Sequence, residues 1–598
     1  MNKIVQEVTE KIITRSHTTR AAYLQLMRQS LDNDKAKNIS AGNKAHAFAA
    51  CPLEDKKKLI GGNWPNIAIV TAYNDMLSAH QPYEHYPEKI KGCARQYSAT
   101  AQVAGGVPAM CDGVTQGQDG MELSLFSRDV IAMASAIALS HNTFNAALYL
   151  GICDKIVPGL LIGALQFGHL PAVFVPSGPM PSGLPNSEKS RVRKAYARGE
   201  ATREELLEAE MQSYHSAGTC TFYGTANSNQ MLMEMMGLHV PGAAFIPPNT
   251  DLRDTLTQEA VRLAIQTAPP IYEIIDEKSI VNAMIGLLAT GGSTNHTIHL
   301  PAIARAAGII IDWDDFDVLS QNIPLLAKIY PNGEADINHF HAAGGMGFII
   351  KTLLENDYLH ADVTTIAGKG LERYAREPKL INDTLTWQDS PSDSGDDNIL
   401  TNCANAFSPN GGMRAVSGNI GRAIVKTSAV DPKHYIVKAP ARVFDNQDDV
   451  LTAYMNGELE RDVIIVLRHQ GPKANGMPEL HKLTPALSTL LEKGHRVALI
   501  TDGRMSGASG TVPAAIQVVP EAVDGGALSR IQNDDMIELD CSRGSLQVLE
   551  DDFSNRPHHK PPISSQHYQT LGRNLFSQFR NKAMNAEKGG SIFFDEEM

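Results

Sequence analysis

Ala147-Leu148-Tyr149-Leu150-Gly151-Ile152-Cys153-Asp154-Lys155 joins a run of apolar residues to three chemically reactive ones. The apolar run predicts a buried strand over 147–152 that stops at Cys153. Two further apolar runs, 67–70 and 172–175, predict strands that also end in turns rich in polar or small residues. The stretch therefore indicates a sheet with chemically reactive side chains at the ends of its strands.

The segment before this strand has the period of a helix. Its apolar residues recur at helical spacing and predict a helix over 123–140 with one buried face. The residues of that predicted face are Leu123, Phe126, Val130, Met133, Ala134 and Ile137. Strands that alternate with helices predict an α/β layer with largely parallel pairing. Residues 1–60 are polar and predict further helices.

The second half of the chain has a different pattern. A polar, acidic stretch at 389–397 is the predicted linker. Beyond it strands dominate, with apolar runs at 423–426, 463–467 and 497–500, and the polar tail from His558 is helical around 571–586. The predicted fold is α/β. A large N-terminal domain (1–390) has a mainly parallel sheet, and a smaller, β-rich, barrel-like domain spans 391–598.

Length and composition limit the class of protein. The 598 residues are too many for one hydrophobic core, and 43% hydrophobic with 20% charged residues is typical of a globular protein. The net charge of −13 argues against nucleic acid and anionic membranes as partners. No apolar run approaches the roughly 20 residues of a membrane helix, and the charged N-terminus does not resemble a secretory signal. We therefore expect a cytoplasmic location.

Seven widely spaced cysteines make a disulfide framework improbable. Cys111, Cys153 and Cys220 lie in loops, 42 and 67 residues apart, which matches no compact ferredoxin pattern. Spacing alone favours buried structural thiols. The neighbouring residues instead favour a metal-binding role, because Cys111 precedes Asp-Gly and Cys153 precedes Asp-Lys. Soft thiolates select iron–sulfur clusters and hard carboxylates suit Mg²⁺ or Mn²⁺.

Three glycine-rich segments could also face a ligand, at 288–296, 471–479 and 502–510. Ser506 follows a predicted strand and could be a nucleophile, part of a phosphate site or a turn residue. A turn is the default interpretation for such a segment. His296 on its own is more often a packed or surface histidine.

Several long motifs are specific enough to indicate a family. They are Asp112-Gly113, Gly117-Gln118-Asp119-Gly120-Met121, Ser127-Arg128-Asp129, Cys153-Asp154-Lys155, Gly291-Gly292-Ser293-Thr294-Asn295 and Asp502-Gly503-Arg504-Met505-Ser506-Gly507. From about 67 to 526 the chain resembles the dihydroxy-acid and 6-phosphogluconate dehydratases. It is most similar to the sugar-acid branch. Ala79 stands where the branched-chain enzyme has a cluster cysteine, and Cys111 stands where that enzyme usually has a small residue.

The resemblance implies an iron–sulfur cluster. Cys153 and Cys220 match its ligands, and we infer that Cys111 is the third thiolate, replacing the one absent at Ala79. Three thiolates on a [4Fe–4S] cluster leave one iron open to substrate, and [2Fe–2S] is the alternative.

The resemblance also implies a divalent metal ion, Mg²⁺ or Mn²⁺. Asp112, Asp154 and Glu479 match its ligands in relatives. Lys155 matches a lysine that is carbamylated there and acts as a further ligand. Ser506 matches the proposed catalytic base.

The implied reaction dehydrates 6-phospho-D-gluconate to 2-dehydro-3-deoxy-6-phosphogluconate in the Entner–Doudoroff pathway. Iron would act as the Lewis acid that removes the C3 hydroxyl. The substrate is a phosphorylated sugar acid, whose phosphate needs cationic or N–H donors. Candidates in the motif regions are Arg128, Arg414, Lys473 and Arg504. Relatives form dimers, so we expect a homodimer.

Three alternatives remain open from the sequence. The chain could act on another sugar acid or on a dihydroxy acid. It could be an iron–sulfur redox sensor, which would not need Asp112, Glu479 or Ser506. It could also be a metal-free protein with structural cysteines only.

Overall fold

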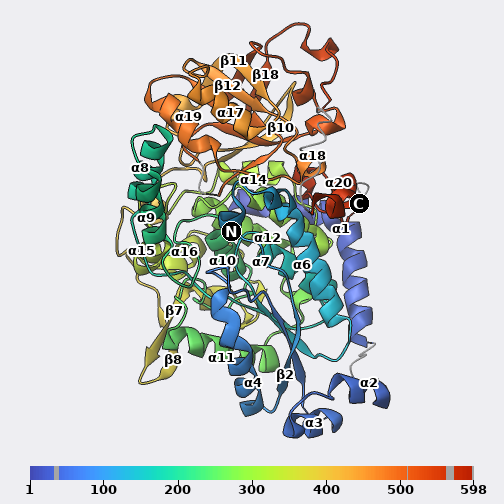
Figure 1. Ribbon diagram of the computed structural model, residues 1–598. Coiled ribbons are helices and arrows are strands. Elements are labelled where there is room, and N and C mark those ends of the chain that lie inside the picture. The colour runs from blue at the N-terminus through green and yellow to red at the C-terminus, as the bar shows by residue number, and fades with distance from the viewer. Residues whose placement is uncertain (33–38, 63, 508–509, 561–571, 595–598) are drawn as a thin grey trace.

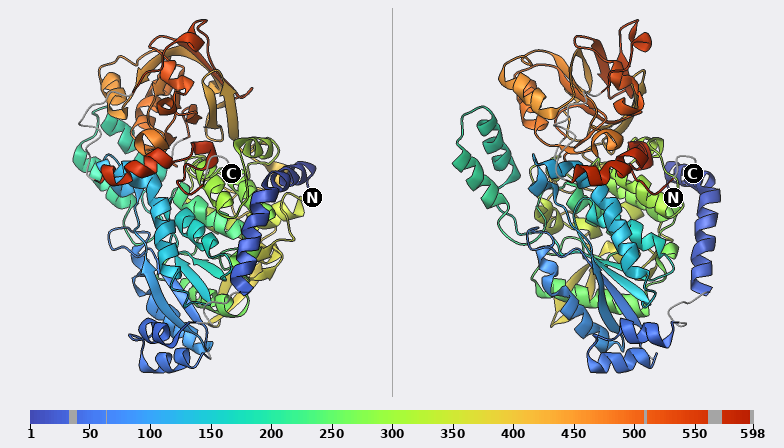
Figure 2. Two further views of the ribbon diagram at one scale, coloured as in Figure 1. Left: turned by 90° about the vertical axis from the view of Figure 1, so that its right-hand side faces the viewer. Right: turned by 45° about the vertical axis from the view of Figure 1, so that its right-hand side comes forward.

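The computed structural model describes residues 1–32, 39–62, 64–507, 510–560 and 572–594. A helical unit built around a parallel sheet forms one end of the molecule, and a β-barrel, orange in Figure 1, forms the other. Both turned views in Figure 2 keep this arrangement. The predicted fold class, an α/β unit followed by a smaller barrel-like unit, is confirmed. None of the described helices combines the length and apolar character needed to cross a membrane.

The sheet of the first unit has the order β2-β1-β3-β4, and every pair in it is parallel. Its strands are β1 (Asn66–Thr71), β2 (Thr100–Gly106), β3 (Ala146–Leu150) and β4 (Ala172–Val175). Strands β1, β3 and β4 are buried along their whole length, which explains their continuous apolar runs. The three predicted strands are confirmed, and the carboxyl ends of all four strands lie at one edge.

Helices α6 (Ser124–Leu139) and α7 (Ile156–Gln166) pack tightly together. The predicted helix at 123–140 is confirmed, but its predicted buried face is wrong, because Met133 and Ile137 are exposed. The face that is buried carries small residues such as Ser135. A Cβ added at Gly159 of α7 would lie 2.5 Å from a carbonyl oxygen of α6, and one at Gly163 would lie 2.7 Å from the Ser135 Cβ. Close helix packing, rather than hydrophobicity, decides which side turns inward.

Helices make up most of the rest of the first unit. The predicted helices in 1–60 are confirmed as α1 (Lys3–Asp32), α2 (Ala41–Ala47) and α3 (Leu53–Ile60). The others are α4 (Tyr86–Gln96), α5 (Asp112–Thr115), α8 (Asn186–Ala197), α9 (Arg203–Ser213), α10 (Thr225–Met235), α11 (Asp251–Gln266), α12 (Glu277–Ala289), α13 (His296–Ala306), α14 (Trp313–Ser320), α15 (Ile337–Ala342) and α16 (Gly345–Glu355). A hairpin of β7 (Arg376–Ile381) and β8 (Thr384–Asp389) follows.

The barrel closes in the order β10-β16-β14-β12-β11-β17-β18-β9. Its strands are β9 (Met413–Gly418), β10 (Gly421–Lys426), β11 (Ile436–Phe444), β12 (Val463–Leu467), β14 (Val497–Thr501), β16 (Ala514–Val519), β17 (Met536–Asp540) and β18 (Ser545–Val548). The predicted strands at 423–426, 463–467 and 497–500 are confirmed. Helices α17 (Gln447–Met455) and α19 (Leu483–Glu492) bury their apolar faces against β12 and β14 in a cluster of their own.

Segments near both ends of the barrel connect it to the first unit. Bridges of Ala327 with Leu400 and of Leu325 with Ser408 hold residues 400–408 against the first unit. After the barrel, the C-terminal tail (572–594) returns to the first unit, and its α20 (Ser577–Lys582) is drawn in red in Figure 1. Residue 571 of the predicted helical tail lies outside the described residues. The proposed domain boundary at 390 stays a prediction.

Replacing Gly159 by Ala should destabilise the protein, because the new methyl would meet a backbone carbonyl at 2.5 Å. We expect a loss of about 1–3 kcal/mol in the free energy of unfolding. Gly92→Ala in α4 is the matched control, because nothing lies within 4 Å of its would-be Cβ. That change should stabilise by about 0.5–1 kcal/mol. Equal unfolding midpoints for the two variants would contradict the packing described.

Candidate functional site

The site begins at the carboxyl ends of β2 and β3. Cys111 precedes the short helix α5, and Cys153 follows β3 with a backbone φ of +77°. This left-handed conformation is uncommon outside glycine and is found at functional sites. The side-chain amide of Asn229 holds it by donating to the carbonyl oxygens of Cys153 and Asp154, each at 2.9 Å. Parallel pairing therefore places both cysteine loops at the same sheet edge.

Cys220, in the loop before α10, completes a group of three thiols. Burial raises the pKa of Cys153 well above its usual value, and the adjacent thiols of Cys111 and Cys220 raise it further. Burial, followed by the charge of Cys111, raises the pKa of Cys220 to about 12. The structure thus brings the three predicted cysteines together. Thiols in such surroundings become thiolates only with a positive partner such as a metal.

The remaining cysteines lie elsewhere, and all seven are unpaired and within the described residues. Cys93 is buried in α4, and Cys541 is part of the apolar core of the barrel. Both have the environment of ordinary structural thiols.

Three carboxylates lie beside the thiols. One oxygen each of Asp112, Asp154 and Glu479 falls within 4.8 Å of the others. The Lys155 ammonium pairs with Asp112 and, at 2.8 Å, with Asp154. Arg504 pairs with Asp112 at 2.9 Å, Asp154 at 3.2 Å and Glu479 at 3.3 Å. Glu479 and Arg504 are neighbours on the short parallel strands β13 (Glu479–Leu480) and β15 (Arg504–Met505) of the second unit.

The positive and negative charges within this group nearly offset one another. Burial alone would lower the pKa of Lys155, but the carboxylates of Asp112 and Asp154 raise it. Burial, with the added repulsion of Asp112, raises the pKa of Glu479 to about 8. Two cations therefore face three acidic groups, and burial disfavours the charged form of Glu479. An added divalent cation would favour that charged form, and an all-oxygen donor set suits Mg²⁺ or Mn²⁺.

A chain of polar contacts through His299 and Arg128 holds Asp154 in position. Its carboxylate lies 3.2 Å from His299 Nε2, and the Nδ1 of that ring lies 3.3 Å from the Arg128 guanidinium. Burial lowers the pKa of His299 to about 4, so the ring is neutral. Arg128 pairs with Asp129 at 3.0 Å, and Asp129 accepts from the N–H of Ile592 at 2.9 Å. The tail thereby reaches the site, which the sequence did not indicate.

The four cations singled out for phosphate binding all have carboxylate partners. The pairs are Arg128 with Asp129, Arg414 with Asp317, Lys473 with Asp524, and Arg504 with the three site carboxylates. These contacts give each of them a structural role.

Ser506 follows β15 directly and is partly buried. The next residue, Gly507, approaches α10 so closely that a Cβ there would lie 2.9 Å from the Thr225 nitrogen. The Ser506 loop is thus held against the start of α10, five residues beyond Cys220. Ala508 and Ser509 of the same motif lie outside the described residues.

A buried cation that the sequence did not reveal is Lys189, in α8. Its charge interacts with those of Arg193, Glu210 and Cys220, and its Nζ donates to the Tyr214 hydroxyl at 3.1 Å. The Nζ also lies 4.4 Å from the centre of the Tyr214 ring. Among described residues, no carboxylate oxygen comes within 4.0 Å of it. Burial lowers its pKa to about 8. In the sequence the charged helix 186–197 is indistinguishable from a solvated one.

Models of the dihydroxy-acid/6-phosphogluconate dehydratase N-terminal and C-terminal domains match residues 64–374 and 398–590. The chain belongs to this dehydratase family. It is 56% identical to a phosphogluconate dehydratase of Pseudomonas aeruginosa and 54% identical to one of Escherichia coli K12, each match covering 99% of both chains. A dihydroxy-acid dehydratase of Acetivibrio thermocellus is 33% identical over 81% of this chain and 86% of its own. The predicted family is confirmed, and the protein is a hydro-lyase.

Arg504→Met should destabilise the metal-free enzyme by about 3–5 kcal/mol, because it leaves buried carboxylates short of a positive partner. Thermal or urea unfolding measures the loss. Arg496→Met is the control, since its pair with Asp462 is well exposed and should contribute less than about 1 kcal/mol. Similar losses in both variants would mean that Arg504 does not hold the site together.

Proposed function

We propose that the enzyme dehydrates 6-phosphogluconate to 2-dehydro-3-deoxy-6-phosphogluconate, the Entner–Doudoroff reaction. The observation that carries this proposal is the contact between a soft three-thiol group and a hard three-carboxylate group at one sheet edge. The choice of substrate is supported by identity, which is 54–56% with phosphogluconate dehydratases over full length but 33% with a dihydroxy-acid dehydratase.

We propose Cys111, Cys153 and Cys220 as the ligands of a [4Fe–4S] cluster, with [2Fe–2S] as the alternative. The fit rests on three adjacent thiols, of which Cys153 is buried and the other two are partly buried, and whose charged forms need a metal. Ala79 is buried and offers no thiol. When bound, such a cluster supplies a Lewis-acidic iron that assists loss of the C3 hydroxyl.

Asp112, Asp154 and Glu479 are the proposed ligands of Mg²⁺ or Mn²⁺, an ion that would offset the charge developing at the substrate's carboxylate end. Lys155 fits the proposed role of a carbamylated ligand. Its ammonium now lies between two of the carboxylates. Carbamylation would convert that cation into another anionic oxygen donor, which would favour a divalent ion at the same place.

The protein's own residues then have separate tasks. Ser506 is the proposed base for the C2 proton, and it needs a cation nearby because an ordinary serine hydroxyl is too weak a base. Arg504 and His299 keep the site carboxylates in position. The enol that remains after loss of water tautomerises to the 2-keto acid.

Lys189 is the proposed partner of an anionic group of the substrate. A buried ammonium that donates to a phenol and has no carboxylate oxygen within 4.0 Å among the described residues is costly, and an anion would reduce that cost. Its charge interacts with that of Cys220, one of the proposed cluster ligands, which supports this role. The substrate phosphate carries the negative charge that would pair with this ammonium. A homodimer and a cytoplasmic location stay predictions.

Anaerobically purified enzyme should contain iron and sulfide and turn over 6-phosphogluconate but not 2,3-dihydroxyisovalerate. Ser506→Ala should lower kcat at least about 100-fold with an unchanged iron content, because it removes only the base. Ser30→Ala, at a partly exposed position of α1, is the control and should have no effect. The opposite substrate preference would refute the proposed substrate. Full function in Ser506→Ala with an intact cluster would favour the redox-sensor alternative.

Lys189→Met should raise KM for 6-phosphogluconate about 10-fold or more, with a smaller effect on kcat, because one charge-assisted contact is lost. For gluconate, which has no phosphate, the same substitution should raise KM much less. Lys194→Met in the same helix is the control, since Lys194 pairs with Glu492 at the surface. An equal loss for both substrates would exclude a phosphate-binding role.

A further inference from the structure

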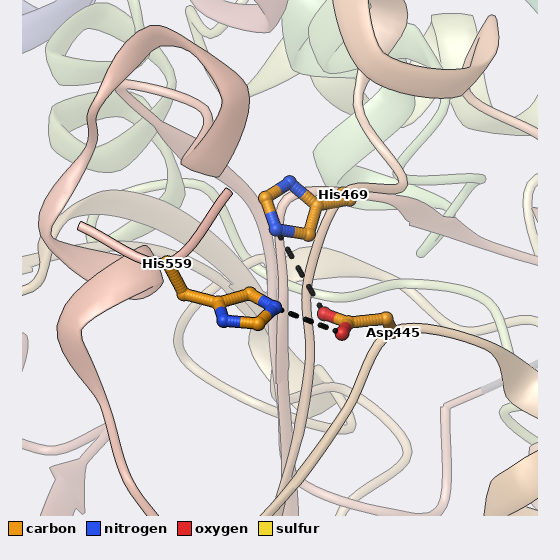
Figure 3. A group of neighbouring side chains, drawn as sticks. All are labelled: Asp445, His469 and His559. Carbon is orange, nitrogen blue, oxygen red and sulfur yellow. Dashed lines mark hydrogen bonds and ion pairs between the residues drawn. The ribbon is translucent and has the colours of Figure 1, made fainter. Parts of the chain in front are cut away.

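A second group of metal-ligating side chains lies on the barrel and shares no residue with the site described above. Asp445 follows β11 and His469 follows β12, two adjacent parallel strands, while His559 comes from the segment after the last barrel strand. One ligand atom of each residue lies within 4.8 Å of the others. Figure 3 shows both imidazole rings beside the Asp445 carboxylate.

The separations suit a small cation. His559 Nε2 lies 3.2 Å from Asp445 Oδ2, and His469 Nε2 lies 3.8 Å from Asp445 Oδ1. Ligand atoms about 2.0–2.1 Å from a tetrahedral Zn²⁺ are about 3.3 Å apart from one another. The Asp445–His559 separation already fits this geometry, and a side-chain movement that brings His469 Nε2 closer would complete it.

His469 provides independent evidence of a ligand. The residue is 6% exposed, and neither of its ring nitrogens has a hydrogen-bond partner within the described chain. Buried polar atoms without partners are rare in native proteins and require an explanation.

The surroundings orient the carboxylate. The Arg468 Nε donates to Asp445 Oδ1 at 2.7 Å, and the Gln470 amide donates to the Asp445 backbone carbonyl at 2.9 Å. Arg468 also donates to two backbone carbonyls, those of Ser529 and Ile531. The guanidinium charge would oppose a second metal–oxygen bond. Arg468 thus orients the carboxylate through Oδ1, while Oδ2 faces His559.

We propose that Asp445, His469 and His559 form a zinc-type site, distinct from the Mg²⁺ or Mn²⁺ site at the catalytic carboxylates. Two imidazoles and one carboxylate suit Zn²⁺, whereas the oxygen-only set does not. His559 is exposed, which leaves a fourth position for water. The ion would fasten the segment that leads into the C-terminal tail onto the barrel. That tail reaches Asp129 beside the catalytic site, so the ion has a structural role.

The test compares Zn²⁺ binding to anaerobically prepared, full-length wild type and His559→Gln, with excess Mg²⁺ present. After equilibrium dialysis, wild type should hold one more Zn²⁺ per chain than the variant, with at least tenfold tighter affinity for that ion. Zn²⁺ should also raise the unfolding temperature of wild type more than that of the variant. Turnover without Zn²⁺ should be unchanged, because His559 lies outside the catalytic group.

His85→Gln is the control, since His85 is largely exposed and lies far from the barrel in sequence. It should behave as wild type. Asp445→Asn should lose the same Zn²⁺ as His559→Gln. Because the comparison is a difference between variants, any Zn²⁺ bound by the cysteines cancels, and the result does not depend on the proposed function. Equal Zn²⁺ content and equal thermal shifts in wild type and His559→Gln would overturn the proposal.

Discussion

Burial of three carboxylates at the contact between the two structural units is the constraint on which the rest of the structure depends. Charged groups removed from water need partners of opposite charge. Arg504 supplies one partner from the second unit, and Lys155 supplies another from the end of β3. Asp112 and Asp154 come from the sheet edge, so the guanidinium joins the two units through charge. The same ion pairs therefore join the two units and assemble the site.

This arrangement explains why soft and hard donors lie together. A parallel sheet delivers its loops to one edge, and two of those loops carry a cysteine followed directly by an aspartate. The thiols and carboxylates therefore form two adjacent groups rather than one mixed group. Outer contacts fix their orientation. His299 and Arg128 support Asp154, and the tail supports Arg128 through Asp129. A reaction that needs one cation at a leaving hydroxyl and another at a carboxylate can use both groups at once.

Some features could be predicted because their causes are local. The strands at 67–70, 147–152 and 172–175 were evident from continuous apolar runs, since both faces of the sheet are covered. The buried face of α6 could not be predicted from hydrophobicity. Its inner side fits the glycines of α7, and Ile137 is left exposed. Lys189 gave no signal either, because a charged helix has the same sequence pattern whether a lysine in it is solvated or enclosed.

The sequence by itself determined the strand ends, the cysteine–aspartate pairs at them and, through long motifs, the family. These features depend on residues adjacent in the chain, or on residue types that only certain chemistry requires. The tertiary structure alone decided which cations are paired, which lysine is buried beside a phenol, and that Asp445, His469 and His559 meet on the barrel. Such contacts join segments that are far apart in sequence. Their charge balance is set by burial, which exists only once the chain has folded.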